Sequence, residues 1–391
     1  MAATWWTAER AGDYTAYLRR NGLLVILAGV ALAIAGLVGL MQLRVESHIL
    51  RFFPPTHPLP KACVEIEEDL VGLTPLELWV SAPPKVLLTP EGLEGLEGLV
   101  GFVRGQADLV ESVSSPLEVL PQDLGPTAQA ALLGALLADP PPGLEHGGML
   151  DQGLAHLRIT VHAYTGSSEA CDDLVREVKG ALQAPPPGVP ALPEGVRVRL
   201  TGGVPLLVRV QVLLLQTQLQ SFVLALALVT LILAAAFRSP LLVVISLVPN
   251  LLPILATLGF MGLTEIPLNT ATVTVAGIAL GLVVDDTIHL LHAFAEARRS
   301  GLSQGLATRR MLLHVARPVL VTSAAVGAGF GVFALSPFRP TLFFGLLIAV
   351  TMAIALACDL GLLPALLLRS APSEDEPQAP DTALPEAPAA G

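Results

Sequence analysis

Long, uninterrupted apolar stretches constrain this chain more than any other feature of its sequence. One lies near the amino terminus, and the others follow one another in the second half of the chain. A helix needs roughly 20 apolar residues to cross the hydrocarbon core of a bilayer. Six stretches approach this length, at residues 21–42, 220–237, 240–263, 268–291, 318–335 and 341–368. The sequence therefore predicts an α-helical membrane bundle of six transmembrane helices, the third of them kinked by Pro249 and Pro253.

Composition excludes several other classes of protein. Of the 391 residues, 53% are hydrophobic and 14% are charged, whereas soluble domains carry about 25% charged residues. The net charge is −11 and the basic residues are few and unclustered, so no nucleic-acid partner is expected. The three cysteines form no CxxC or Cys/His spacing, and neither a metal nor another cofactor is expected. Residues 370–391, rich in Ala, Pro, Glu and Asp, are predicted to be a disordered acidic tail.

Arginines indicate how the bundle is oriented. The first apolar stretch is too long for a cleaved signal peptide, so we expect it to be retained. With six spans, most of the arginines near span ends fall on one side of the membrane, which the positive-inside rule assigns to the cytoplasm. These residues are Arg19, Arg20, Arg238, Arg298, Arg299, Arg309, Arg310 and Arg369. We expect a multi-pass protein of the bacterial inner membrane with both termini cytoplasmic, the amino-terminal segment being 1–20.

Residues 45–215, between the first and second spans, are predicted to form a periplasmic domain. Alternating apolar residues indicate strands at 76–82, 109–113, 157–164 and 196–200. Helical spacing indicates helices at 89–106 and 167–182, and a proline-rich insert surrounds 140–142. This order predicts a ferredoxin-like α/β domain. Cys63 and Cys171 both fall within it; a disulfide and two free thiols are both compatible with the sequence, and two free thiols are the favoured interpretation.

The chain becomes helical and apolar again at residue 204 and continues without a break into the second span. A continuous helix there would couple the exterior domain to the membrane part. Residues 216–369 are expected to form a bundle of the five remaining spans.

Two adjacent carboxylates, Asp285 and Asp286, lie in the fourth span. A charge at such depth costs at least about 2.5–3.5 kcal/mol, so ionisable residues there usually face a bundle interior or a wet cavity. At 100° per residue, Asp285, His289 and His292 share a stripe, while Asp286 remains near His289. A carboxylate that is neutral in one conformation and charged in another is what a proton carrier needs. The alternatives are a structural hydrogen-bonded pair for the acids and solvated interfacial positions for the histidines.

Polar residues of two neighbouring spans are expected at the same depth in the membrane as these acids. Thr322 and Ser323 of the fifth span and Asp359 of the sixth are expected at a similar level. We therefore predict a proton relay of Asp285, Asp286, His289, Thr322 and Asp359. The alternative for the two hydroxyls is a bond to their own helix backbone.

Small residues in the spans predict close helix packing or hinges. Gly277 and Gly281 form a GxxxG pair just before the acids, and Gly327 lies in a glycine-rich part of the fifth span.

At these residues the chain resembles a known family. The string GIALGLVVDDTIHLLH is similar to the fourth-span signature of the RND superfamily, whose drug-efflux members carry GLxVDDA. FRSPLLVVISLVPNLLPILATLGFMGLTEIPLNTAT and RPVLVTSAAVGAGFGVFALSPFRPTLFFG resemble its neighbouring spans. The resemblance covers 200–370 strongly, the rest more loosely, and is greatest to the MMPL-type, predicted-exporter branch with its DDTIH motif. It implies proton-driven export of hydrophobic or lipid-like compounds, Asp285 and Asp286 being the proton-binding pair and the exterior domain resembling the porter domain.

The chain departs from that family in two respects. It contains a single six-span half, and its three lysines, Lys61, Lys85 and Lys179, all lie outside the spans. A homodimer, or pairing with a separately encoded second RND half, would restore twelve spans; the remaining alternative is that the sequence is a fragment. Membrane lipids and a hydrophobic small molecule or lipid are the other partners expected.

Three other functions are alternatives for a bundle of this kind. A SecD/SecF-like protein-translocation accessory also has six spans and uses protons. A sterol-sensing-like regulatory module shares the bundle but transports nothing. An intramembrane aspartyl protease would use Asp285 and Asp359, but the GxGD context of such enzymes is missing. We therefore expect a transporter and not an enzyme.

Overall fold

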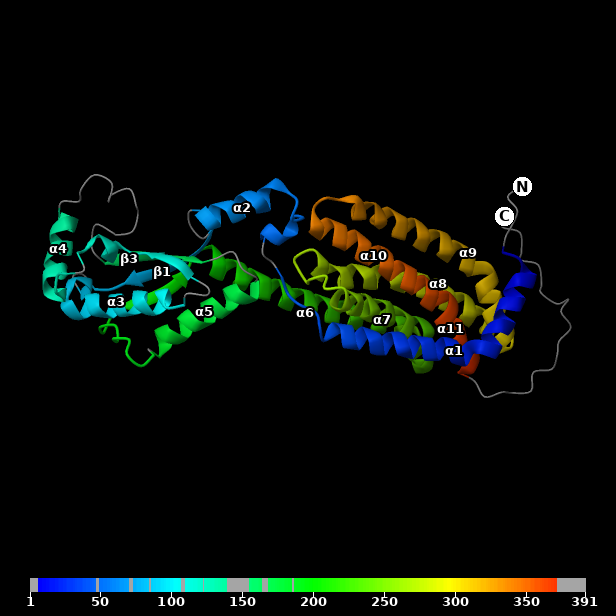
Figure 1. The fold of residues 1–391 in the computed structure, drawn as a ribbon. Helices are drawn as coiled ribbons and strands as arrows, with labels where there is room; N and C mark the ends of the chain where they lie inside the picture. The colour runs from blue at the N-terminus through cyan, green and yellow to red at the C-terminus, as the bar shows by residue number, and fades with distance from the viewer. Residues whose placement is uncertain are drawn as a thin grey trace.

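The computed structural model describes residues 6–46, 49–69, 73–83, 86–106, 110–121, 123–138, 155–163, 168–184 and 186–370. A helix bundle and a smaller α/β domain lie end to end, and α6 runs from one into the other (Figure 1). The predicted insert at 140–142 and the tail from residue 371 lie outside the described residues, as does the side chain of Cys171. Cys63 is a free thiol.

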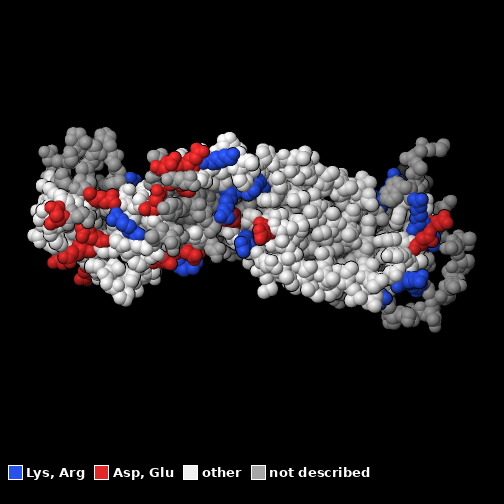
Figure 2. All heavy atoms as spheres, in the orientation of Figure 1, with Lys and Arg blue, Asp and Glu red and all other residues white. Residues whose placement is uncertain are grey.

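Within the described residues, six helices are long and apolar enough to cross a membrane, as predicted. They are α1 (Ala8–Leu40), α6 (Gly203–Phe237), α7 (Pro240–Leu263), α8 (Val275–Arg299), α9 (Gln304–Gly331) and a sixth made of three segments. The three segments are α10 (Arg339–Ala357), a π-helical turn (Cys358–Leu362) and α11 (Leu363–Arg369). Figure 2 shows the bundle as a surface almost free of charge between two charged zones, which suits contact with lipid.

Most of the helices extend beyond the predicted membrane spans. Only α7 has the predicted bounds, because the Ser239 hydroxyl caps Leu242 N–H and Pro240 starts the first turn. Elsewhere the helices continue past the apolar stretch at one end, since charged residues end a span without ending a helix; α8, predicted from residue 268, begins only at Val275 and runs on to Arg299. Thus α1 begins at Ala8 and not at residue 21, α9 begins at Gln304 with Pro318 inside it, and α6 begins at Gly203.

The first turns of α1 cross the end of the bundle (Figure 1). The Trp6 indole N–H donates to Leu312 O at 3.0 Å, and the Arg309 guanidinium donates to Ala8 O at 3.1 Å. Arg369 lies beside Gly22. Arginines from α1, α9 and α11 therefore gather at this end of the bundle, where Figure 2 shows a cluster of basic side chains.

Glycines allow α1 and α7 to approach each other closely. A Cβ atom added at Gly39 would collide with the backbone of Gly259, and one added at Gly262 would collide with the backbone of Gly39. Backbone contact of this kind is typical of small-residue helix pairs in membranes. This contact holds the first span against the bundle.

We predict that Gly262→Ala destabilises the fold, because neither helix can yield to the new methyl group without moving its backbone. Overpacking of this kind costs about 1–3 kcal/mol. A lower melting temperature in detergent, followed by light scattering or dye binding, would report it. Gly329→Ala on α9 is the matched control, since its Cβ would meet open space; an equal loss of stability in both variants would contradict the prediction.

The α/β domain is built on a four-stranded antiparallel sheet in the order β2-β3-β1-β4. All four strands lie close to their predicted positions: β1 (Thr74–Ser81), β2 (Val110–Ser114), β3 (His156–Ala163) and β4 (Arg197–Thr201). Alternate residues of β1 and β3 pack against α3 (Pro90–Arg104) and α5 (Ser168–Gln183), which cover one face of the sheet. Two further helices, α2 (Pro58–Asp69) and α4 (Pro126–Ala138), were not predicted.

The helix α6 connects this domain to the bundle. It follows β4 after one residue, packs against β1 and β4 at its start, and packs against α7 and α8 further along. At about 1.5 Å per residue its 35 residues extend about 52 Å, about 20 Å more than a hydrocarbon core requires. The predicted continuous helix is confirmed.

Candidate ion-coupling site

A cluster of polar side chains lies inside the bundle, where four helices meet. It contains Asn250 from α7, Asp286 and Thr287 from α8, Ser323 from α9, and Asp359 from the π-helical turn. Each of these residues is at most 8% exposed. Buried polar groups in a bilayer must find hydrogen-bond partners within the protein, so their bonds define the site.

Asp286 is held by two neighbouring hydroxyls of α9. The Ser323 hydroxyl donates to Oδ2 at 2.5 Å, and the Thr322 hydroxyl approaches Oδ1 at 3.4 Å. Thr322 also contacts the carbonyl oxygens of Pro318 and Val319 at 3.1 and 3.0 Å. Ser323 is therefore the firm partner of this carboxylate, and Thr322 divides its hydroxyl between Asp286 and its own helix.

Asp359 is completely buried and only half satisfied. The Thr287 hydroxyl donates to its Oδ1 at 2.7 Å, while its buried Oδ2 has no hydrogen-bond partner. Asp286 is close enough to interact with it electrostatically. Leaving a buried carboxylate oxygen without a partner costs free energy. This oxygen therefore needs a bound proton or another positively polarised group.

The hydroxyl of Thr287 has more hydrogen-bond acceptors around it than it can donate to. Its single proton faces three acceptors: Asp359 Oδ1, Asn250 Oδ1 at 3.1 Å and Val283 O at 3.5 Å. The amide of Asn250 donates to Ser246 O at 2.6 Å, which turns its oxygen toward Thr287. The cluster thus holds more acceptors than donors, so an added proton or small cation would satisfy it.

The π-helical turn around Asp359 has an identifiable cause. An α-helix would require the N–H of residue 364 to bond Leu360 O, but Pro364 has none. The Tyr14 hydroxyl of α1 donates to Leu360 O instead, at 3.1 Å. Such π-bulges occur frequently at functional sites, and this one displaces Asp359 from a regular helical position.

Asp285 lies on the opposite side of α8 from this cluster. Its side chain is 76% exposed, and Oδ1 lies 3.6 Å from Nε2 of His289, which is 67% exposed. His292 is exposed as well. The predicted stripe of Asp285, His289 and His292 is therefore present, but it faces away from Asp286 and Asp359. The Asp285–Asp359 pair considered for a protease is not brought together.

Comparison with known proteins identifies the family. The sequence model described as "MMPL family" matches residues 65–381. The chain belongs to the MMPL family. It is also 26% identical over 359 residues, 87% of this chain and 89% of the relative, to a Methanocaldococcus jannaschii protein named as a membrane protein, MJ1562. The family predicted from the motifs of the membrane spans is thus confirmed.

The glycines predicted to allow close helix packing make few close contacts within this MMPL-family chain. Gly277 and Gly281 have open space where a side chain would be, and the close helix contact lies at α1 and α7 instead. Gly327 makes an ordinary contact with Met352. Pro249 and Pro253 are both buried inside α7, which continues through them as a helix.

Three parts of the site were missed in the sequence. Asn250 and Thr287 were overlooked although the first is a lone amide in an apolar span and the second directly follows the two acids. The Tyr14 contact with Leu360 joins residues 346 positions apart, and no local pattern indicates it. Within the described ranges, no group of three His, Cys, Asp or Glu side chains gathers as a metal site would require.

Proposed function

We propose that this MMPL-family protein is a proton-coupled exporter of hydrophobic or lipid-like compounds. The observation that carries the proposal is the unpartnered Oδ2 of Asp359, buried beside Asp286 in a cluster with too few hydrogen-bond donors. A proton on that oxygen would supply the missing donor. Ionisable groups so placed in membrane proteins commonly belong to ion pathways.

In this mechanism the two carboxylates alternate between two bonding patterns. With a proton on Asp359, the cluster joining α7, α8, α9 and the π-helical turn is satisfied and the helices are held together. When the proton leaves, the charged carboxylates of Asp286 and Asp359 repel each other. The hydroxyls of Thr287 and Ser323 donate one hydrogen bond each, which is too few to stabilise two buried charges. The helices then adopt a second packing, and α6 transmits the movement to the exterior domain.

Orientation follows from the basic end of the bundle. The arginines of α1, α9 and α11 mark the cytoplasmic side by the positive-inside rule. The protein would then lie in the cytoplasmic membrane with both termini inside and a ferredoxin-like, porter-type domain outside. Protons would enter from the outer side while substrate is captured there and exported.

A second copy of the chain, or another half of the same kind, would cover α8. Gly277, Gly281, Asp285 and His289 recur every four residues on one exposed stripe of that helix. Acyl chains cannot satisfy a carboxylate and an imidazole, whereas small residues permit another helix to approach. In a pair, Asp285 and His289 would face the equivalent helix, where the predicted relay residues of both halves would meet.

We predict that Gly281→Cys, in a chain whose three native cysteines are replaced, forms a disulfide-linked dimer in native membranes on mild oxidation. The reason is that a two-fold pair brings residue 281 near its own copy. Gel mobility under non-reducing conditions measures the product. Leu27→Cys is the control, because Leu27 is 53% exposed on α1, which packs on other helices than α8; dimers formed equally at both positions would contradict the pairing.

The function is tested by reconstitution into liposomes that contain a pH-sensitive dye. A fluorescent lysophospholipid is the transported probe, and an imposed pH gradient is the driving force. Probe movement should accompany proton entry and stop when a protonophore collapses the gradient. No proton-dependent movement, together with copurification of the protein-translocation channel, would favour the SecD/SecF-like alternative and overturn the exporter.

A further inference from the structure

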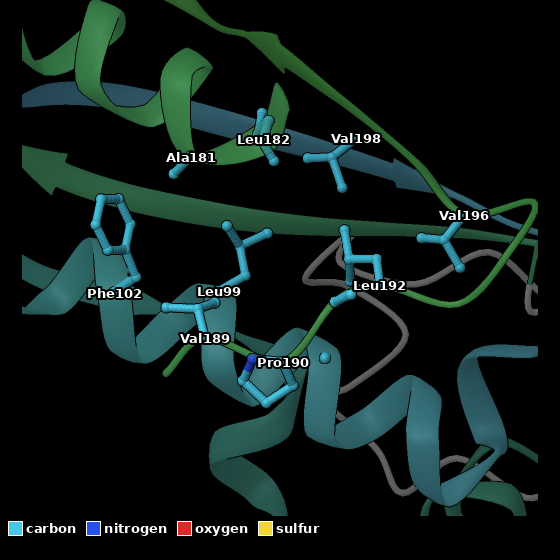
Figure 3. A pocket seen from close by; sticks show the side chains of 11 residues that line it. Leu99, Phe102, Ala181, Leu182, Val189, Pro190, Leu192, Val196 and Val198 are labelled. Carbon is cyan, nitrogen blue, oxygen red and sulfur yellow. The ribbon is translucent and has the colours of Figure 1, made fainter. Parts of the chain in front are cut away.

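The hollow on the α/β domain and the basic end of the bundle present different side chains to their surroundings. The hollow lies between α3, α5 and β4, is open to the surface, and has no charged side chain in its lining (Figure 3). The basic end of the bundle borders a surface almost free of charge (Figure 2). Lipid headgroups would meet the protein at this border, and α9 presents basic residues there in a regular row.

The row on α9 consists of Arg310, His314 and Arg317, and Val321 continues it. Their spacing of four, three and four residues places them on one side of an α-helix. His314 and Arg317 are exposed, Arg310 is half-buried and Val321 is 56% exposed. Leu312, which is fully buried, lies on the opposite side of the helix. The basic row of Arg310, His314 and Arg317 therefore faces away from the bundle.

The basic row ends where the apolar part of the fifth span begins. Arg317 is the last charged residue before the apolar stretch 318–335. Arg310 lies about 10 Å further from that stretch along the helix. An arginine at such a boundary lays its apolar stem along the hydrocarbon and extends its charged group to the headgroups. The row thus spans the depth at which lipid phosphates lie.

The positive charge of the basic row has no counter-charge on its own helix. The segment Gln304–Gly331 contains no Asp or Glu, and within the described residues neither Arg310 nor Arg317 forms an ion pair. The adjacent Arg309 is turned to α1, where it donates to Ala8 O. Nδ1 of His314 donates to Arg310 O at 2.9 Å, which holds the imidazole against the helix between the two guanidinium groups.

We infer that the basic row binds the phosphate of an anionic phospholipid in the cytoplasmic leaflet, with an acyl chain lying on Val321. Guanidinium groups bind phosphate oxygens through paired hydrogen bonds, whereas the cation of a zwitterionic headgroup would be repelled by them. Each arginine near an anionic leaflet contributes about fivefold in affinity, so two should favour an anionic lipid about 25-fold. The bound lipid would stabilise α9, the helix whose Thr322 and Ser323 contact Asp286. Binding needs no transport, so the inference does not depend on the exporter proposal.

Native mass spectrometry of the full chain tests the inference, with dioleoylphosphatidylglycerol and dioleoylphosphatidylcholine as the titrated lipids. The natural chain should bind the anionic lipid at least tenfold more tightly than the zwitterionic one. Arg310→Gln combined with Arg317→Gln should weaken binding of the anionic lipid at least tenfold and leave the other unchanged. Arg298→Gln combined with Arg299→Gln is the matched control, because it removes the same charge from exposed residues at the same end of the bundle. Its affinity should stay within about twofold of the natural chain.

Equal losses in the two double variants, or no preference of the natural chain for the anionic lipid, would overturn the inference. The melting temperature gives a second measurement, since a ligand that binds the folded state raises it. The anionic lipid should raise the melting temperature of the natural chain and of the control, but not of the variant that lacks both arginines of the row.

Two further measurements identify the occupant of the basic row. Excess glycerol 3-phosphate should not displace the lipid, because it has no acyl chain; full displacement would exclude a lipid as the specific ligand. A chain that ends at Ser370 lacks the acidic residues Glu374, Asp375 and Glu376 and should bind the anionic lipid as the full chain does. Binding that arises only after this truncation would assign the row to the protein's own acidic segment and overturn the inference.

Discussion

Asp286→Asn is expected to reduce proton-driven transport to the level of protein-free liposomes. Asparagine keeps the oxygen that accepts from the Ser323 hydroxyl but cannot gain or lose a proton. The fold should survive, because the substitution removes a charge from a buried site and leaves the size of the side chain unchanged. Transport and melting temperature are measured on the same preparation, and Asp359→Asn is expected to behave alike.

The matched control for this substitution is Glu296→Gln. Glu296 lies on the same helix but is exposed near the arginine-rich end, so its neutralisation should leave transport within about twofold of the natural rate. The double variant of Asp286 and Asp359 should be no more defective than either single one, because residues that act as a unit are not additive. Residual proton-driven transport in Asp286→Asn would exclude this cluster as the coupling site.

Gln216→Pro is expected to uncouple the α/β domain from the bundle. Gln216 is exposed on α6, in the part before the predicted span, so loss of its side chain alone matters little. Proline there removes a backbone hydrogen bond and breaks the helix, at about 3 kcal/mol or more. Transport should fall to background.

Gln216→Ala provides the comparison, because alanine keeps the helix and removes the same side chain. Its transport should match the natural chain. If Gln216→Pro transported normally while circular dichroism confirmed a broken helix, a rigid α6 would not be part of the mechanism. If both variants failed, the side chain itself, and not helix continuity, would be responsible.

The sequence predicted the elements of this fold well where a single physical pattern decides them. Strands β1 and β3 alternate strictly, and α7 has a serine cap followed by proline. By contrast, α4 is apolar on all sides and does not show the periodicity of an amphipathic helix. The helix α2 is amphipathic, but it starts with two prolines in three residues, which are typical of a turn or loop. The extension of α6 was predicted, but those of α1, α8 and α9 beyond their spans were missed, because hydropathy locates the bilayer and not the end of a helix.

The site was predicted only in part, for a geometric reason. Adjacent residues on a helix point about 100° apart, so only one of Asp285 and Asp286 can face the bundle interior. The helix sequence alone does not decide which one; the packing of α8 against α7 and α9 does. The structure brings Asp286, Thr322 and Ser323 together, as expected from their depth, whereas the side chain of Asp285 is exposed away from them. The contacts of Thr287 and Asn250 were not foreseen.

The hydroxyl of Tyr14 gives the amino-terminal turns of α1 an importance that their position does not suggest. They stabilise the last membrane span, because the Tyr14 hydroxyl donates a hydrogen bond to the carbonyl oxygen of Leu360. Pro364 has no N–H with which to make the α-helical hydrogen bond to this oxygen. A chain shortened to the first apolar stretch would keep every acid of the bundle and lose this support. The π-helical turn that positions Asp359 would then be free to relax. The amino-terminal turns of α1 are therefore required for the geometry of the polar cluster around Asp359.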